Sequence, residues 1–97
     1  MRWKLSLQAK ADLRRIGHRI ARDNPEVAVA WVHKLQDRAR LAGQAPWQGR
    51  KVPEIDREDV REAIVGNYRI VYIVQDRTVQ ILTIFEGHRL LPDLDLP

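Results

Sequence analysis

Asp23-Asn24-Pro25-Glu26 divides the first half of the chain into two helical segments. Asn24 can accept hydrogen bonds from the free backbone N–H groups at a helix start, so it is the predicted N-cap. Pro25 suits the first helical position, and Glu26 complements the positive end of the helix. A helix is therefore predicted to begin at Pro25, and the short link before it predicts an antiparallel helical hairpin.

Apolar residues at helical spacing support a helix on each side of this junction. The stripe before it consists of Ala9, Leu13, Ile16 and Ile20. The stripe after it consists of Ala28, Trp31, Val32, Leu35, Ala39 and Ala42. Ser6 or a neighbouring residue is the expected cap of the first helix, and Gly43 is the expected stop of the second.

Strand-like patterns flank the hairpin. Strands are predicted at residues 3–7, 51–55, 60–65, 68–74 and 78–85. Pro53 cannot donate a ladder hydrogen bond, which places its strand at an edge of the sheet. The strand at 68–74 has two apolar faces and is expected to be central. The expected fold is α+β, with an N-terminal strand and a helical hairpin packed on a small, mostly antiparallel sheet.

Length and composition fit a single domain over residues 1–97, with residues 92–97 expected to form a loose tail. Hydrophobic residues make up 44% of the chain and charged residues 31%, the balance of a folded globular protein. Cysteine is absent, no signal peptide is visible, and no run approaches the ~20 apolar residues of a membrane span. We therefore expect a cytoplasmic protein that does not enter a membrane.

Charge is distributed unevenly along the chain. Residues 1–50 carry eleven Lys and Arg against four Asp and Glu, whereas residues 51–97 carry six against nine. The basic first half can attract nucleic acid or an acidic protein partner. The alternative is a solvated helix surface without a partner.

Few residues fit the requirements of a metal, cofactor or nucleophile site. His18, His33 and His88 lie on three different predicted elements without ligand-like spacing, so no metal is expected. No glycine-rich phosphate loop is present, and no cofactor is expected. Ser6 is the only serine and is interpreted as a helix cap rather than a nucleophile.

Arg69 is the first of the charged residues that remain as candidates, because it lies within an otherwise apolar strand. A buried arginine requires a partner. Glu54, Glu62 and Glu86 are the candidate internal partners, and a phosphate or carboxylate ligand is the alternative.

Glu86, His88 and Arg89 follow the last strand, where they could supply a base, an acid and charge stabilisation for phosphodiester cleavage. The alternative is that these three residues are polar surface residues at the end of the strand, without a catalytic role. Tyr68 and Tyr72 share one strand face and are expected in the core.

These residues together resemble the RelE/ParE superfamily of toxins from bacterial type II toxin–antitoxin modules, closest to the ParE-like or plasmid-stabilisation branch. The resemblance rests on Ala9-x-x-Asp12-Leu13-x-x-Ile16, Asn24-Pro25, Leu35, Pro46, Gly49-Arg50-x-Val52-Pro53-Glu54, Arg61-Glu62, Tyr68-Arg69-Ile70-Val71-Tyr72, Ile81-Leu82-x-Ile84-Phe85-x-Gly87-x-Arg89 and Leu91-Pro92. It implies a cognate antitoxin, ParD-like or related, that forms a hetero-oligomer with the toxin. Ile20, Val27 and Trp31 are the candidate antitoxin contacts, with burial in the core as the alternative.

The resemblance implies one of two cellular targets for the toxin. ParE-like members poison DNA gyrase without chemistry of their own, and the candidate target contacts here are Arg50, Tyr68, Arg69, His88 and Arg89. RelE-like members cut messenger RNA on the ribosome, which would assign catalysis to Glu54, Arg69, Glu86 and His88. No tyrosine follows Tyr72 and Lys51 is nearly alone in the second half, so we expect a non-enzymatic gyrase inhibitor. A third hypothesis is an inactive relative that only binds its antitoxin.

Overall fold

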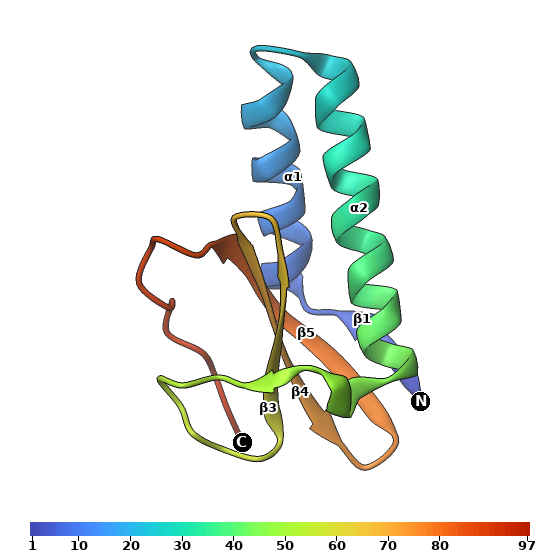
Figure 1. The fold of residues 1–97 in the computed structure, drawn as a ribbon, viewed down its shortest axis with the longest axis vertical. Coiled ribbons are helices and arrows are strands. Elements are labelled where there is room, and N and C mark those ends of the chain that lie inside the picture. Colours follow the sequence, from blue (N-terminus) through green and yellow to red (C-terminus); the bar gives the residue numbers. More distant parts are fainter.

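The computed structural model describes residues 1–97 and contains two helices and five strands in one sheet (Figure 1). In chain order the elements are β1 (Arg2–Leu5), α1 (Leu7–Ala21), α2 (Pro25–Gln44), a short 3-10 turn η1 (Pro46–Gln48), β2 (Arg50–Lys51), β3 (Val60–Val65), β4 (Tyr68–Gln75) and β5 (Thr78–Glu86). The strand order across the sheet is β1-β5-β4-β3-β2. Only β1 and β5 are parallel, which confirms the predicted α+β fold with a mostly antiparallel sheet.

Both helix starts have the side-chain caps that the sequence predicts. The Ser6 hydroxyl oxygen accepts a hydrogen bond from the Ala9 N–H at 3.0 Å. Asn24 Oδ1 accepts from the N–H groups of Glu26 and Val27, at 3.1 and 3.2 Å. These caps satisfy backbone donors that have no partner inside the helix, and they set where each helix begins.

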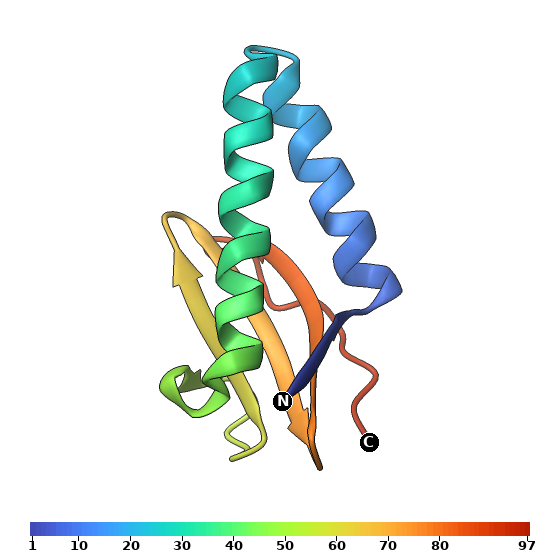
Figure 2. The same ribbon diagram turned by 90° about the vertical axis from the view of Figure 1, so that its right-hand side faces the viewer.

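The helical hairpin packs on one face of the sheet and forms the main core with it. Leu13 of α1, Leu35 of α2 and Tyr72 of β4 are among its buried members. The upper turns of the hairpin stand clear of the sheet in two perpendicular views (Figures 1 and 2). The tip of the hairpin therefore has no sheet beneath it.

A second, smaller core lies on the opposite face of the sheet. Its buried members are Val52, Val60, Val71, Ile73, Leu82 and Phe85. Ile55 covers it from the β2–β3 connection, and Leu91, Leu94 and Leu96 cover it from the C-terminal segment. Residues 92–97 form no helix or strand, and Leu94 and Leu96 of this segment pack against the second core.

Two predicted strands are shorter than expected. The strand predicted at 51–55 comprises only Arg50–Lys51, because the chain turns at Val52, whose carbonyl accepts from the N–H groups of Ile55 and Asp56. The strand predicted at 3–7 ends at Leu5, because Ser6 caps α1. Leu7 consequently starts the helix and is 83% exposed rather than half-buried in a strand. None of the helices has the length and apolar character needed to cross a membrane.

Candidate functional site

The candidate residues on β4 and β5 are divided between the two faces of the sheet. Tyr68 and Arg69 are neighbours on β4, so their side chains point to opposite faces. Tyr68 faces the helices, is buried, and lies 5.5 Å from Trp31 between ring centroids. Arg69 faces the second core, where its guanidinium lies 5.2 Å from the centroid of the Phe85 ring. The five target-contact candidates therefore do not form one surface.

Arg69 is held by two carboxylates on its own face of the sheet. Its Nε donates to Glu62 Oε1 at 2.6 Å, and its two terminal nitrogens donate to Glu54 at 2.7 and 2.8 Å. Glu62 has a fully buried side chain and also accepts from Arg50 Nε at 2.5 Å. The internal ion pair expected for Arg69 is present with Glu54 and Glu62, but not with Glu86.

These contacts change the acid–base properties of the pair. Hydrogen bonds from the Arg69 guanidinium lower the pKa of the Glu54 carboxyl to about 2. The same hydrogen bonds raise the pKa of Arg69 above its ordinary value. Only 11% of the Arg69 side chain is exposed, whereas 61% of the Arg50 side chain is. Of the two arginines in this network, Arg50 is thus the one that remains accessible to a partner.

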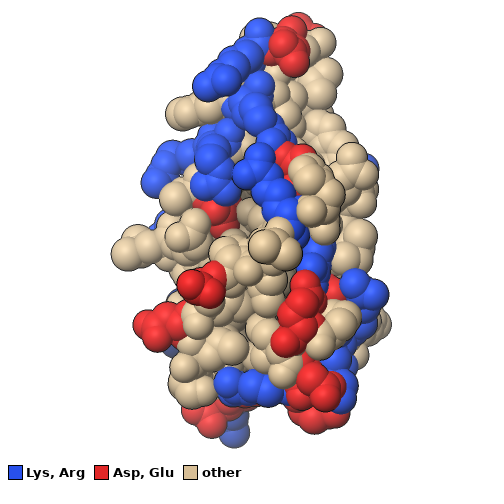
Figure 3. Space-filling view, turned by 90° about the vertical axis from the view of Figure 1, so that its left-hand side faces the viewer, with Lys and Arg blue, Asp and Glu red and all other residues tan.

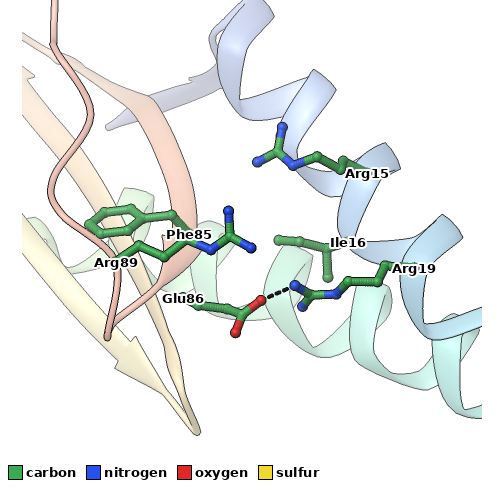
Figure 4. A pocket seen from close by; sticks show the side chains of 6 residues that line it. All are labelled: Arg15, Ile16, Arg19, Phe85, Glu86 and Arg89. Atoms are coloured by element: carbon green, nitrogen blue, oxygen red, sulfur yellow. Dashed lines mark hydrogen bonds and ion pairs between the residues drawn. The ribbon is translucent and has the colours of Figure 1, made fainter.

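A second group of charged side chains lies on the helix side of the sheet, where α1 crosses the end of β5. It forms a small pocket of about 90 Å³ that is lined by Arg15, Ile16, Arg19, Phe85, Glu86 and Arg89 (Figure 4). Arg19 pairs with Glu86 and donates to the Tyr68 hydroxyl at 2.8 Å. The three arginines point into the same space, and we call this feature the arginine pocket.

Asp12 holds Arg15, one of the residues that line the arginine pocket. Its buried carboxylate accepts from the Thr83 hydroxyl at 2.7 Å and from the Ile84 N–H at 2.9 Å. Its other oxygen accepts from Gln8 and Arg15, at 2.8 and 2.9 Å. The sequence patterns identified Arg89 as a candidate but missed Arg15 and Arg19. Their i, i+4 spacing on a helix was the available signal, since it places both on one side.

The residues assigned to ribonuclease chemistry do not meet. Glu54 and Arg69 bind each other on one face of the sheet. Glu86 lies on the other face, opposite Tyr68 in the β4–β5 register. His88 is 68% exposed, and its Nδ1 lies 3.5 Å from Glu86 Oε2. The four side chains therefore form two separate pairs rather than one acid–base site.

The candidate antitoxin contacts lie on the hairpin. Ile20 and Trp31 are partly buried against the main core, and Trp31 also packs beside the β3–β4 turn at Gly66. Val27 is in the first turn of α2 and is 41% exposed.

Comparison with known proteins agrees with this architecture. Residues 3–91 match the model of the ParE toxin of the type II toxin–antitoxin system parDE. The chain belongs to the ParE toxin family. A solved ParE-like structure, described as the chromosomal ParDE TA system from P. aeruginosa, superposes with a TM-score of 0.74 at 26% identity. The match covers 89% of this chain and 95% of that one. A search of curated proteins gave no significant match.

Membership of the ParE family confirms the resemblance inferred from the sequence, including its branch. The match spans both faces of the sheet and the hairpin, so the arginine pocket and the Glu54–Arg69 pair both lie within the ParE toxin domain.

Proposed function

We propose that this ParE toxin inhibits growth by binding DNA gyrase and that a cognate ParD-type antitoxin neutralises it. The observation that carries the proposal is the family match over residues 3–91. The separation of Glu54 and Arg69 from Glu86 and His88 supports a non-enzymatic mode of action. General acid–base chemistry needs its groups within hydrogen-bond reach of one reacting centre.

The proposed antitoxin surface is the side of the hairpin that extends past the sheet. Ile20, Val27 and Trp31 give this side an apolar character, with Val27 the most accessible of the three. An amphipathic helix of the antitoxin would fit here, because apolar side chains at helical spacing can interdigitate with those of the hairpin.

The proposed target surface is centred on the accessible basic residues. Arg50, His88 and Arg89 are exposed, whereas Tyr68 is buried and Arg69 is engaged by Glu54 and Glu62. We therefore assign target contact to the first three. Tyr68 and Arg69 would act indirectly, by holding Arg19 and Glu54 in place.

The target is tested by adding the purified chain to a gyrase supercoiling assay and by mapping RNA ends after induction in cells. We expect loss of supercoiling, a DNA-damage response, and no new codon-linked RNA cuts. An unchanged supercoiling rate at every dose would remove gyrase as the target. New ribosome-dependent cuts would support the ribonuclease hypothesis instead, and unaffected growth would indicate an inactive relative. Co-purification with the antitoxin tests the partner independently of the target.

A further inference from the structure

We propose that the arginine pocket is a receptor for a single carboxylate, carried by an acidic side chain of the antitoxin. The inference rests on the proposed function for the identity of the partner. It adds a carboxylate-binding site to the antitoxin surface, at a place separate from the apolar contacts proposed for Ile20, Val27 and Trp31.

Convergent guanidinium groups are the first observation behind this proposal. Arg15 and Arg19 reach the pocket from α1, and Arg89 reaches it from the turn that follows β5 (Figure 4). The turn is held by a hydrogen bond from the Arg89 N–H to the Glu86 carbonyl at 3.0 Å. Guanidinium forks are well shaped to donate paired hydrogen bonds to a carboxylate.

Arg89 is the one arginine of the pocket whose side chain has no internal partner. Arg15 is bound to Asp12, and Arg19 is bound to Glu86 and Tyr68. The Arg89 side chain forms no ion pair with any carboxylate of the chain, although it points into the pocket beside Glu86. A ligand at this position would therefore gain the donors of Arg89 without breaking an internal pair.

The charge of the pocket favours one carboxylate over a nucleic acid. Its three arginines face two carboxylates, Glu86 and Asp12, which leaves a net charge of +1. Nucleic acid binding needs several uncompensated cations along a track of phosphates. Figure 3 shows Lys and Arg gathered over the helical upper part of this side, with acidic side chains scattered below them. A long polyanion would meet these acids after a short distance.

The size and lining of the pocket also suit a single acidic side chain. A space of about 90 Å³ has room for a carboxyl group and its methylene. Ile16 provides an apolar wall for the methylene, while the arginines surround the charged end. The partly shielded position strengthens the interaction relative to a fully exposed ion pair.

The experiment follows the Nε–Hε signals of the arginines by NMR during titration with a tetraglutamate peptide. The Arg89 signal is expected to shift in the wild-type chain. Arg89→Ala is expected to weaken peptide binding about tenfold, the loss of one charge-assisted pair. Arg77→Ala is the matched control, because Arg77 is exposed in the β4–β5 turn at the other end of β5 and forms no ion pair. The control is expected to bind like the wild type.

The same variants are then measured against the antitoxin, with a short DNA duplex as the competing ligand. Arg89→Ala should lose affinity for the antitoxin and Arg77→Ala should not. Antitoxin and peptide binding that are unaffected by Arg89→Ala would overturn the inference and leave the proposed partner intact. A shift of Arg89 by DNA but not by peptide would also overturn it. If the wild-type chain fails to bind any antitoxin, the proposed function fails, and the peptide titration still decides the chemistry of the pocket.

Discussion

Asp12 of α1 accepts a hydrogen bond from the backbone N–H of Ile84 in β5, 72 residues later in the chain, at 2.9 Å. This contact is needed because β1 accompanies β5 only as far as Ile81. Beyond that point the outer edge of β5 has no strand neighbour, and an unpaired buried N–H is costly. Ser6, the N-cap of α1, satisfies a carbonyl of the same edge, since its hydroxyl donates to the Leu82 carbonyl at 2.9 Å. The start of α1 therefore completes the edge of the sheet.

Replacing Asp12 by alanine should destabilise the fold strongly. The change removes the acceptor of the Thr83 hydroxyl and the Ile84 N–H, and both are buried. We expect a loss of about 3 kcal/mol in the free energy of unfolding, as for other buried charged hydrogen-bond partners. Urea denaturation measures it, with Asp37→Ala on the exposed face of α2 as the control. If the free energy of unfolding falls no further than in the control, water must have taken over the hydrogen bonds of Asp12.

Arg69→Ala should destabilise the protein through Glu62. The fully buried Glu62 side chain would retain only Arg50 as a cationic partner, and breaking a buried pair on one side typically costs about 3 kcal/mol. The double variant Arg69→Leu with Glu62→Leu should recover much of this loss, because no buried charge remains uncompensated. Thermal denaturation of the single and double variants checks this. A double variant no more stable than Arg69→Ala would contradict the electrostatic explanation.

Glu54→Gln should have a pH-dependent effect on stability. The folded pKa of Glu54, about 2, lies below its ordinary value of 4.5. Its ionised form therefore stabilises the fold above about pH 4.5, and this contribution is lost as the pH falls toward 2. Because 42% of the side chain is exposed, solvent screening limits the contribution to about 1 kcal/mol.

The measurement is chemical denaturation of the wild type and Glu54→Gln at neutral and acidic pH. We expect the difference in unfolding free energy to shrink as the pH falls through this range. Asp95→Asn, in the C-terminal segment, has no ion pair to lose and should show no such trend. A constant difference across the range would assign the effect to packing rather than ionisation.

Gly49→Ala should be destabilising because the added methyl group has no space. A Cβ at this position would collide with the Tyr72 hydroxyl and lie 2.8 Å from the Glu62 carbonyl oxygen. Tyr72 would have to move, and it would lose the buried hydrogen bond that it donates to the Pro46 carbonyl at 2.6 Å. We expect a cost of about 2 kcal/mol or more in denaturation experiments. At Gly87 the nearest atom to an added Cβ is 3.4 Å away, so Gly87→Ala should be much milder.

Val27→Glu should weaken antitoxin binding with little change in stability. Val27 is 41% exposed at the start of α2, where a carboxylate is compatible with the helix dipole. Burying that charge in an apolar interface should reduce affinity by about tenfold or more. Calorimetric titration with the antitoxin tests this, using Leu7→Glu at the exposed start of α1 as the control. Equal affinities for Val27→Glu and the control would place the antitoxin elsewhere.

Local chemistry explains why the hairpin was predictable from sequence. Asn24 and Pro25 act on backbone groups within one helical turn, so their effect does not depend on the rest of the fold. The central position of β4 was predictable for a similar reason, because apolar residues on both of its faces require cover on both sides.

The register of β5 was harder to predict from the sequence. The β4–β5 pairing shifts between Val71 and Tyr72, which leaves Leu82 of β5 as an extra residue without a partner on β4. Ile81 and Ile84 consequently share the helix-side core, a pairing that strict alternation does not predict.

The arginine pocket and the packed C-terminal segment depend on tertiary arrangement alone. Arg15 and Arg89 are far apart in sequence, and only the crossing of α1 over the end of β5 brings them together. Leu94 and Leu96 cover a surface that is assembled from several strands. Sequence patterns describe neighbours along the chain, so they could identify Arg89 as a candidate but not its companions.

The parallel pairing of β1 with β5 also determines the order in which the protein can be assembled during synthesis. Residues 2–5 are synthesised long before their partners, residues 78–81. The two helices of the hairpin are close in sequence and can pair early, whereas β1 cannot join the sheet until residues 78–81 have been made. The nascent protein would therefore carry an exposed, apolar hairpin for most of its synthesis. An antitoxin that recognises this hairpin could engage the toxin before it has completed its fold.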